Sequence, residues 1–331
     1  MEETKEQVKT EQNIQHKAEI KKSEPKKSIK QTLFEIYDKK YKVLLLIPFI
    51  VLVLAIGQII YQYNTTGDFL IKDVSLKGGV TITIPYGNEF DAQSLENSLS
   101  KSFSQNDINV RLLRGAGVTT GAIIEADIDG SNRQQLDFLV SEIGKSLNIE
   151  MSKTNYGIEV VGSSLGTSFF MESLIALAVA FIFMGLVVLI YFRSYIPSLA
   201  IILATFSDMV ISLAVVNLLG IKIGTAGIAA FLMLIGYGVD TNILLTVRVL
   251  KRKEGSVMDR VMGSLKTGMT MTFVAMLSVT VVLFMAQSDV IRQIMIITLV
   301  GLFADILFTW VQNVGLLRIY LERKSKKGVS V

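Results

Sequence analysis

Long apolar stretches alternate with short polar ones along most of this chain. Six of them hold about 20 or more residues with few charges, the length that a helix needs to cross the hydrocarbon core of a bilayer. Pro197 lies in the first turn of the third stretch, a position that tolerates proline. We therefore predict a polytopic α-helical membrane protein with six transmembrane helices, over residues 43–62, 169–191, 197–219, 223–248, 268–287 and 291–317.

Residues 63–168 have a different pattern, in which short alternating runs are separated by turn residues and amphipathic helices. The runs predict strands, and the leucine spacing between them predicts two helices. Their order, β-α-β-β-α-β, is that of a ferredoxin-like domain. We expect an α+β ferredoxin-like domain between the first and second spans, with its elements at Gly79–Ile84, Asp91–Phe103, Asn109–Leu113, Ala122–Ile128, a second helix after Asp129, and 148–161.

Composition supports the membrane assignment and excludes several kinds of site. Half of the 331 residues are hydrophobic, and the mean hydropathy is +0.49, too apolar for an ordinary soluble domain. The absence of cysteine excludes disulfides and iron–sulfur clusters, and the one histidine, His16, cannot build a metal site by itself. No catalytic constellation is visible in residues 63–168, so we expect a binding or gating domain, no cofactor and no enzyme activity.

Basic residues predict the orientation in the membrane. The tail up to Lys42 holds eleven lysines, and further Lys and Arg residues cluster at 193, 248–266 and 318–327. With six crossings, all four segments fall on one side, which the positive-inside rule makes the cytoplasm. We expect cytoplasmic tails at 1–42 and 318–331, an external domain at 63–168, an uncleaved first span in the cell membrane, and a short helix on the lipid surface at Ile29–Lys42. This use of basic charge gives no reason to expect nucleic acid as a partner.

Three carboxylates lie inside predicted spans. Asp208 comes eleven residues after Pro197, Asp240 comes nine residues before Val249, and Asp305 comes twelve residues before Leu317. At 1.5 Å per residue, all three lie about 14–18 Å from the cytoplasmic edge, near the middle of the bilayer. A carboxylate there must be neutralised, paired or hydrated. Either these acids carry ions or they join helices as buried hydrogen-bonding groups.

The surroundings of Asp240 favour a functional role. Gly236 and Gly238 permit close helix contact or bending, and Thr241 and Asn242 add hydrogen-bonding groups. A cationic partner is available in Lys266, near the start of the fifth span. Its long side chain either reaches toward the acids or extends to the cytoplasmic headgroups.

Several segments resemble signatures of one known family. They are Phe192–Ser194 with Pro197, Leu234–Thr241, Leu265–Thr272, and Asp73 with Leu76–Gly79. With the order of one helix, a domain and five helices, they resemble the SecF branch of the SecD/SecF protein-export family in the RND superfamily. The motifs are closer to the archaeal members.

This resemblance implies an accessory subunit of the Sec protein translocase. Such a subunit works with a SecD-like subunit and the Sec translocon channel, contacts exported polypeptides and membrane lipids, and uses the transmembrane ion (proton) gradient. The family's ion-coupling aspartate falls on Asp240, and its basic residue falls on Lys266, where bacterial members have arginine.

Two other functions fit the same pattern. An RND-type small-molecule or lipid exporter subunit has similar spans, but such exporters usually carry two copies of this unit in one chain. A scaffold or insertion factor would not need the three acids.

Overall fold

The computed structural model describes residues 37–85, 90–104, 106–115, 118–152, 155–251, 255–286 and 288–326. His16 and most of the predicted surface helix Ile29–Lys42 lie outside these residues. The residues up to Leu44 form a unit of their own, in which α3 (Tyr41–Leu44) is one helical turn. Everything described below belongs to the second unit, Leu45–Val331.

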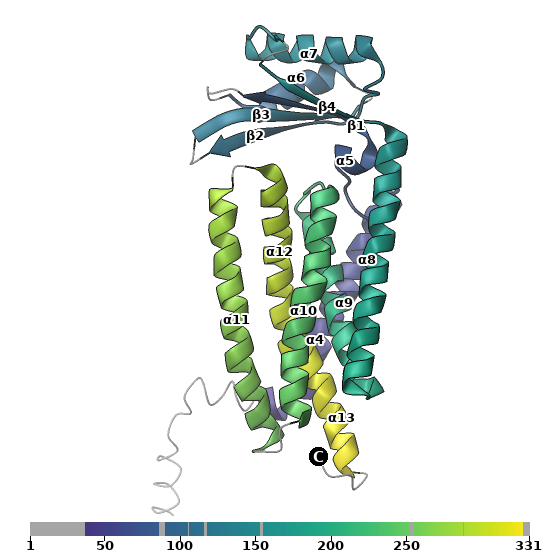
Figure 1. The fold of residues 1–331 in the computed structure, drawn as a ribbon, viewed down its shortest axis with the longest axis vertical. Coiled ribbons are helices and arrows are strands. Elements are labelled where there is room, and N and C mark those ends of the chain that lie inside the picture. Colours follow the sequence, from purple (N-terminus) through teal and green to yellow (C-terminus); the bar gives the residue numbers. More distant parts are fainter. Residues whose placement is uncertain are drawn as a thin grey trace, which may run out of the picture. The chain divides into compact units, whose positions relative to one another are not determined.

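Six helical stretches among the described residues are long and apolar enough to cross a membrane, which confirms the predicted number of spans. The last stretch is continuous but consists of three elements, an α-helix, a π-helical turn and a second α-helix. We call these three elements together span six. Figure 1 shows the helices running roughly alongside one another. Their elements are α4 (Leu46–Thr66), α8 (Ser163–Phe192), α9 (Tyr195–Leu218), α10 (Thr225–Lys251), α11 (Val257–Met285), and span six with α12 (Asp289–Leu307), η1 (Phe308–Asn313) and α13 (Val314–Lys326).

Two of these helices begin well before the apolar stretches that predicted them. The fifth span was expected from residue 268, but α11 starts at Val257 because Ser256 and Asp259 form a capping box. The second was expected from residue 169, but α8 starts at Ser163. Hydropathy detects the part of a helix that fits the lipid, whereas caps and packing decide where the helix begins.

The domain between α4 and α8 is a four-stranded antiparallel sheet with strand order β2-β3-β1-β4. Its four strands and its two longer helices follow the predicted order along the chain, and one helical turn before the first strand was not predicted. The last strand covers only the end of the predicted 148–161, and Asn148, where the strand was expected to start, instead ends α7 in a left-handed conformation with φ 53°. The elements are α5 (Val74–Lys77), β1 (Gly79–Pro85), α6 (Ala92–Ser102), β2 (Ile108–Gly115), β3 (Val118–Ala126), α7 (Arg133–Leu147) and β4 (Gly157–Val161).

The two faces of this sheet differ. On β1, Val80, Ile82 and Ile84 are fully buried in the core beneath α6 and α7. The alternate residues, Thr81 and Thr83, point to the opposite face. Figure 1 shows α6 and α7 on the side of the sheet away from the long helices. The polar face of the sheet is therefore turned toward the ends of those helices.

Gly78 allows the domain to approach α8 closely, and Gly79 allows α5 and β1 to approach Ala126 of β3. Both have positive φ values, of 89° and 137°, which favour glycine. A Cβ atom at Gly78 would lie 2.5 Å from the Cα atom of Ser163, and one at Gly166 would lie 2.7 Å from the Gly78 nitrogen. The Lys77-Gly78-Gly79 sequence thus has a packing role at the start of α8.

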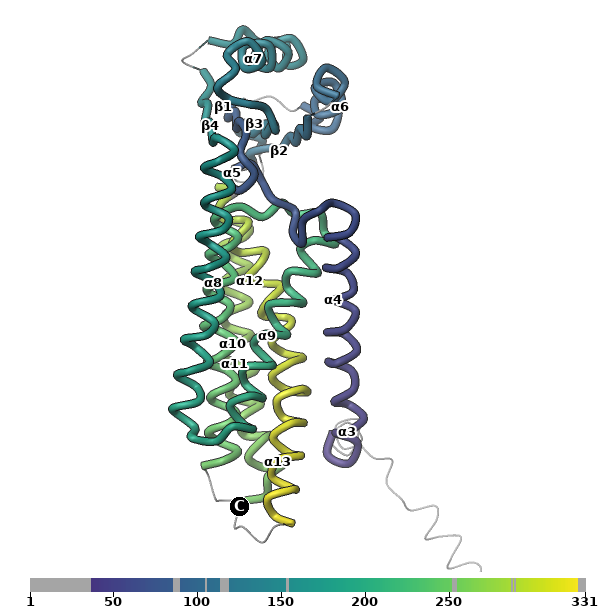
Figure 2. The backbone as a smooth tube through the Cα atoms, turned by 90° about the vertical axis from the view of Figure 1, so that its right-hand side faces the viewer, coloured from purple at the N-terminus to yellow at the C-terminus, as the bar shows by residue number. Residues whose placement is uncertain are grey.

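Figure 2 shows α4 beside α9 and span six. Its contact with them is apolar, since Leu52 packs against Ala204 of α9 and against Ala304 and Phe308 of span six. Because α4 presents few polar groups to the bundle, the candidate chemistry lies on the other helices.

Candidate functional site

Polar side chains gather where α9, α10 and span six pack together. These three are the most buried of the six spanning helices. Eight of their buried polar residues make up a group that we call the buried polar cluster: Ser207, Asp208, Thr241, Asn242, Asp305, Thr309, Gln312 and Asn313.

Two of the three predicted acids lie in this cluster. Asp208 on α9 and Asp305 on span six are each only 3% exposed, and their carboxyl groups are close enough to interact electrostatically. The Thr309 hydroxyl donates a 2.6 Å hydrogen bond to Asp305 Oδ1, and Thr241 lies near the same carboxyl group. Neither oxygen of the Asp208 carboxyl group has a hydrogen-bond partner among the described residues. The structure therefore brings Asp208 and Asp305 together.

Gly238 makes room for the Asp208 carboxyl group. A Cβ atom at position 238 would lie 3.1 Å from Asp208 Oδ2, a tighter contact than nine in ten real Cβ atoms make. Gly238 is buried, and its carbonyl oxygen accepts a 2.7 Å hydrogen bond from the Asn242 side chain. One predicted glycine thus positions α10 directly against an acid of α9.

Cross-helix amide bonds complete the cluster. Asn313 Nδ2 donates to Asn242 Oδ1 at 2.6 Å, and Gln312 Nε2 donates to the Ser207 hydroxyl at 3.3 Å. Both amides belong to or follow directly from the π turn η1, a type of turn frequent at functional sites. The sequence reasoning missed Ser207, Thr309, Gln312 and Asn313. Thr309, Gln312 and Asn313 did have a signal, the spacing 305, 309, 312 and 313, which places four polar residues on one face of a helix, whereas Ser207 had none.

Asp240 lies apart from the buried acids. It is exposed on the surface of α10, as is Gly236, which has nothing within 4 Å of an added Cβ atom. Two residues along an α-helix differ by about 200° in direction, so Asp240 points away from the side that carries Gly238 and Asn242. Thr241 and Asn242, by contrast, are buried in the cluster.

Lys266 is also exposed, and it lies nine residues after the start of α11. Among the described residues, no ion pair joins it, or any other basic side chain, to Asp208, Asp240 or Asp305. Two basic side chains do join α10 to α11: Arg248 donates to the Gly263 carbonyl and the Thr267 hydroxyl at 2.8 Å each, and Arg260 donates to the Val249 carbonyl at 3.0 Å.

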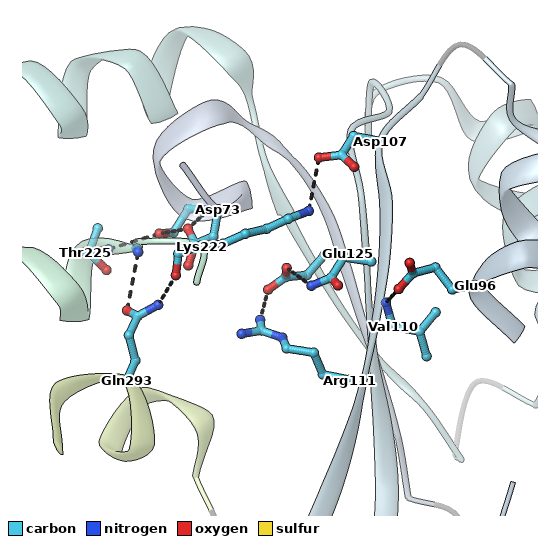
Figure 3. Close-up of polar contacts among 12 residues, drawn as sticks. Asp73, Glu96, Asp107, Val110, Arg111, Glu125, Lys222, Thr225 and Gln293 are labelled. Atoms are coloured by element: carbon cyan, nitrogen blue, oxygen red, sulfur yellow. Dashed lines mark hydrogen bonds and ion pairs between the residues drawn. The ribbon is translucent and has the colours of Figure 1, made fainter. Parts of the chain in front are cut away.

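A second polar region joins the sheet to the helix ends, and Figure 3 shows it. We call it the sheet–helix junction. Asp73 caps α5, and its carboxylate lies so close to Gly224 that a Cβ atom added there would be 2.1 Å from it.

Hydrogen bonds hold the loop before α10. The Ser75 hydroxyl accepts a hydrogen bond from the Thr225 amide, at the start of α10. Gln293 of span six accepts from the Gly224 amide and donates to the Lys222 carbonyl. The loop before α10 is therefore held from two sides.

The polar face of the sheet contributes a buried ion pair to this junction. Glu125 on β3 is paired with Arg111 on β2 and bonded to Asn109 (Figure 3). Burial raises the pKa of the Glu125 carboxyl above its usual value, and the Arg111 guanidinium only partly opposes this effect. Lys222 reaches the sheet through a 3.0 Å ion pair with Asp107. A cavity of about 270 Å³ lies between this face and the ends of α10 and span six.

Comparison with known proteins gives a consistent assignment. The sequence model described as "Protein export membrane protein SecD/SecF, C-terminal" matches residues 142–323. The chain is 35% identical over 292 residues to the protein-export membrane protein SecF of Methanothermobacter thermautotrophicus, covering 87% of this chain and 95% of that protein. It is 36% identical over 296 residues to SecF of Methanocaldococcus jannaschii, covering 87% and 99%.

A solved structure shares the fold. The crystal structure of SecDF, a translocon-associated membrane protein from Thermus thermophilus, superposes with a TM-score of 0.66 at 18% identity. The match covers 85% of this chain and 38% of that chain, so this protein spans well under half of the longer one. With more than half of its residues in the family match and archaeal relatives aligned over nearly their full length, this chain belongs to the SecD/SecF family of protein-export membrane proteins.

Proposed function

We propose that this chain is a SecF-like accessory subunit of the Sec translocase, which works with a SecD-like subunit and uses the transmembrane ion gradient to assist protein export. The observation that carries the proposal is the pair of acids, Asp208 and Asp305, buried between α9 and span six in a family of protein-export proteins. Buried carboxyl groups in a membrane bundle are expensive to maintain and mark ion pathways by default.

The proposed topology has both termini in the cytoplasm and a ferredoxin-like domain outside. The distribution of lysine and arginine supports this orientation. The antiparallel sheet order and the two helices on one face support the ferredoxin-like description. In this arrangement the sheet–helix junction lies at the external membrane surface, and the domain meets exported polypeptides there.

A partner subunit is proposed from the surface of α10. Asp240 belongs to a stripe of exposed residues at helical spacing, with Leu232, Met233, Gly236 and Tyr237. An aspartate that faces lipid at the middle of a span costs about 2.5–3.5 kcal/mol. A polar partner surface removes this cost, and Gly236 lets another helix approach closely. We assign this stripe to the contact with a SecD-like subunit.

In that complex, Asp240 and Lys266 act on the partner's side of α10 and α11, while Asp208 and Asp305 act inside this chain. Asp240 and Lys266 gain a function only when a second subunit covers them. Their role in the contact between subunits explains why they lie apart from Asp208 and Asp305.

The test is gradient-dependent export by the reconstituted complex of this chain with its SecD partner and the translocon. Asp240→Asn should abolish the stimulation by the ion gradient while the complex still assembles. Leu232→Ile, on the same stripe, is the matched control and should leave export unchanged. Normal stimulation in Asp240→Asn would refute the role assigned to Asp240, and failure to co-purify a SecD-like partner would refute the subunit proposal.

A further inference from the structure

A cavity lies between the start of α11 and the end of α13. Figure 1 shows these two helix ends at the end of the bundle away from the sheet. The cavity has a volume of about 580 Å³, within the range of about 300–1,000 Å³ that is typical of ligand sites. We call it the basic pocket, and its lining includes Arg260, Arg318, Leu321, Glu322, Ser325 and Lys326.

Basic charge dominates the lining of this pocket. Arg260 of α11 and Arg318 and Lys326 of α13 contribute three basic side chains, whereas Glu322 is the one acidic side chain among the described residues that line it. Residues 252–254, which come just before the start of α11 in the sequence, add two basic side chains and one acidic one. A cleft lined mainly by charges of one sign concentrates their field, so this pocket favours an anion.

The two arginines reach the pocket from different helices, and each is held by a contact to a neighbouring helix. Arg260 donates a 3.0 Å hydrogen bond to the Val249 carbonyl of α10. Arg318 donates to the sulfur atom of Met258 in α11, at 3.9 Å. A guanidinium group has the planar geometry that matches a phosphate, and holding it in place lowers the entropy cost of binding.

The start of α11 does not itself supply the anion site. The Asp259 carboxylate accepts hydrogen bonds from the Ser256 amide and hydroxyl, at 2.9 and 2.7 Å, in the capping box. This bonding places a negative charge at the helix start and uses a donor that an anion would need there. An anion in the pocket is therefore held by basic side chains.

The pocket lies at the depth of the lipid headgroups. The apolar stretch of span six ends at Leu317, so Arg318 marks the edge of the hydrocarbon. Lys326 lies eight residues further along α13, or about 12 Å at 1.5 Å per residue. The headgroup layer is about 5–8 Å thick on each side of the hydrocarbon. The lining of the pocket thus includes the level at which lipid phosphates lie, and Leu321 provides apolar surface at that level.

We propose that the basic pocket binds the phosphate of an anionic membrane lipid, such as one with a phosphoglycerol headgroup. Arg260 and Arg318 bind the phosphate from two helices, and Lys326 adds positive charge at the outer end. Basic pockets between membrane helices are a recurrent form of lipid headgroup site. The bound lipid holds the start of α11 against the end of span six. It requires neither a partner subunit nor the coupling role of Asp240.

The experiment uses the full chain, purified alone and placed in phosphatidylcholine nanodiscs into which phosphatidylglycerol is titrated. Native mass spectrometry counts the lipids that stay bound, and thermal unfolding gives the melting temperature. We expect one phosphatidylglycerol per chain to bind more tightly than the rest, with a melting temperature raised by about 5 °C at about a hundred times Kd. A melting temperature that phosphatidylglycerol does not change would overturn the proposal.

A second arm separates a lipid from a free phosphate. Glycerol 3-phosphate carries the same anionic group without acyl chains, so we expect it neither to raise the melting temperature nor to displace the bound lipid. Equal stabilisation by glycerol 3-phosphate would overturn the assignment of the pocket to a lipid.

Two pairs of substitutions with equal net charge locate the lipid. Arg260→Gln with Arg318→Gln removes two basic side chains from the lining, whereas Arg323→Gln with Lys324→Gln removes two from the same part of α13 outside the lining. The first pair should weaken phosphatidylglycerol binding about tenfold more than the second, because it also removes charge-assisted hydrogen bonds to the phosphate. Equal losses would show only a general attraction of basic charge to the membrane surface and would overturn the site.

If the first pair does not fold, Lys326→Gln is compared with Lys324→Gln. Lys326 is exposed and lines the pocket, and Lys324 does not line it. Lys326→Gln should weaken binding about threefold more than Lys324→Gln, and equal affinities would overturn the proposal. None of these measurements involves export, so failure of the lipid site leaves the proposed function standing. Normal export by Asp240→Asn would likewise leave the lipid site standing.

Discussion

Asn313 of span six donates a 2.6 Å hydrogen bond to Asn242 of α10, and both side chains are fully buried. This bond joins the two helices within the buried polar cluster. It also fixes which way the Asn242 amide faces, because its own NH₂ group is bonded to the Gly238 carbonyl.

We predict that this amide pair contributes measurably to stability. Asn313→Ala leaves the buried Asn242 oxygen without a donor, so the chain should lose about 1–2 kcal/mol. A double-mutant cycle with Asn242→Ala should give a coupling energy of about 0.5–1.5 kcal/mol, the range for hydrogen bonds between membrane helices. Unfolding in mixed detergent micelles measures all four proteins. Strictly additive losses would mean that the two amides do not interact.

The two glycines of α10 should respond in opposite ways to alanine. Alanine normally stabilises a helix by up to about 1 kcal/mol relative to glycine, and Gly236→Ala should follow this rule because its side is open. Gly238→Ala places a methyl group 3.1 Å from Asp208 Oδ2, so it should lose that gain and destabilise the chain. Thermal unfolding of the isolated chain measures the melting temperature of each variant relative to the wild type. Equal effects would contradict the close packing of α10 on α9.

The sheet–helix junction should be sensitive at Gly224. A Cβ atom there would overlap the Asp73 carboxylate at 2.1 Å, so Gly224→Ala should displace the loop before α10 and cost about 1–3 kcal/mol. Gly57→Ala on α4, where nothing lies within 4 Å, is the control and should not destabilise the chain. Limited proteolysis and thermal unfolding report on both. A Gly224→Ala protein as stable as the control would show that the loop moves aside freely.

The buried Glu125 should make the stability of the chain depend on pH. Because burial raises its pKa in the folded protein, the folded state holds this proton more tightly than the unfolded chain does. Its contribution is therefore fully present below the unfolded pKa of about 4.3 and is lost as the pH rises through the folded pKa. Compared with Glu125→Gln, the wild type should become progressively less stable over that range. Parallel pH profiles for the two proteins would argue against this effect of burial.

Hydropathy and alternation were sufficient to predict the spans and the order of strands and helices. The number of consecutive apolar residues decides whether a helix can cross a bilayer, and this number can be counted in the sequence. The helix starts were not accessible in this way. Ser163 and Val257 begin their helices outside the apolar stretches, where a glycine contact and a capping box decide.

The relation among the acids was only partly predictable. Their similar depth followed from counting residues, but the direction of each side chain depends on how each helix is rotated in the bundle. Gly238 and Asn242 face α9 and span six, so Asp240, between them in sequence, faces outward. Gln312 and Asn313 were missed because polar residues near the end of a span are common, and the helix that they face is not known from the sequence.

The π turn also sets the direction of everything that follows it. A π turn accommodates one residue more than an α-helix does, so α13 is rotated by about 100° from where a regular helix would leave it. That rotation brings the Tyr320 hydroxyl to within 3.3 Å of Ser194, in the bend between α8 and α9. Removing one residue from the segment Phe308–Asn313 would rotate α13 about its axis and turn its basic side chains in another direction. The winding of span six at η1 therefore determines which side of α13 carries these charges.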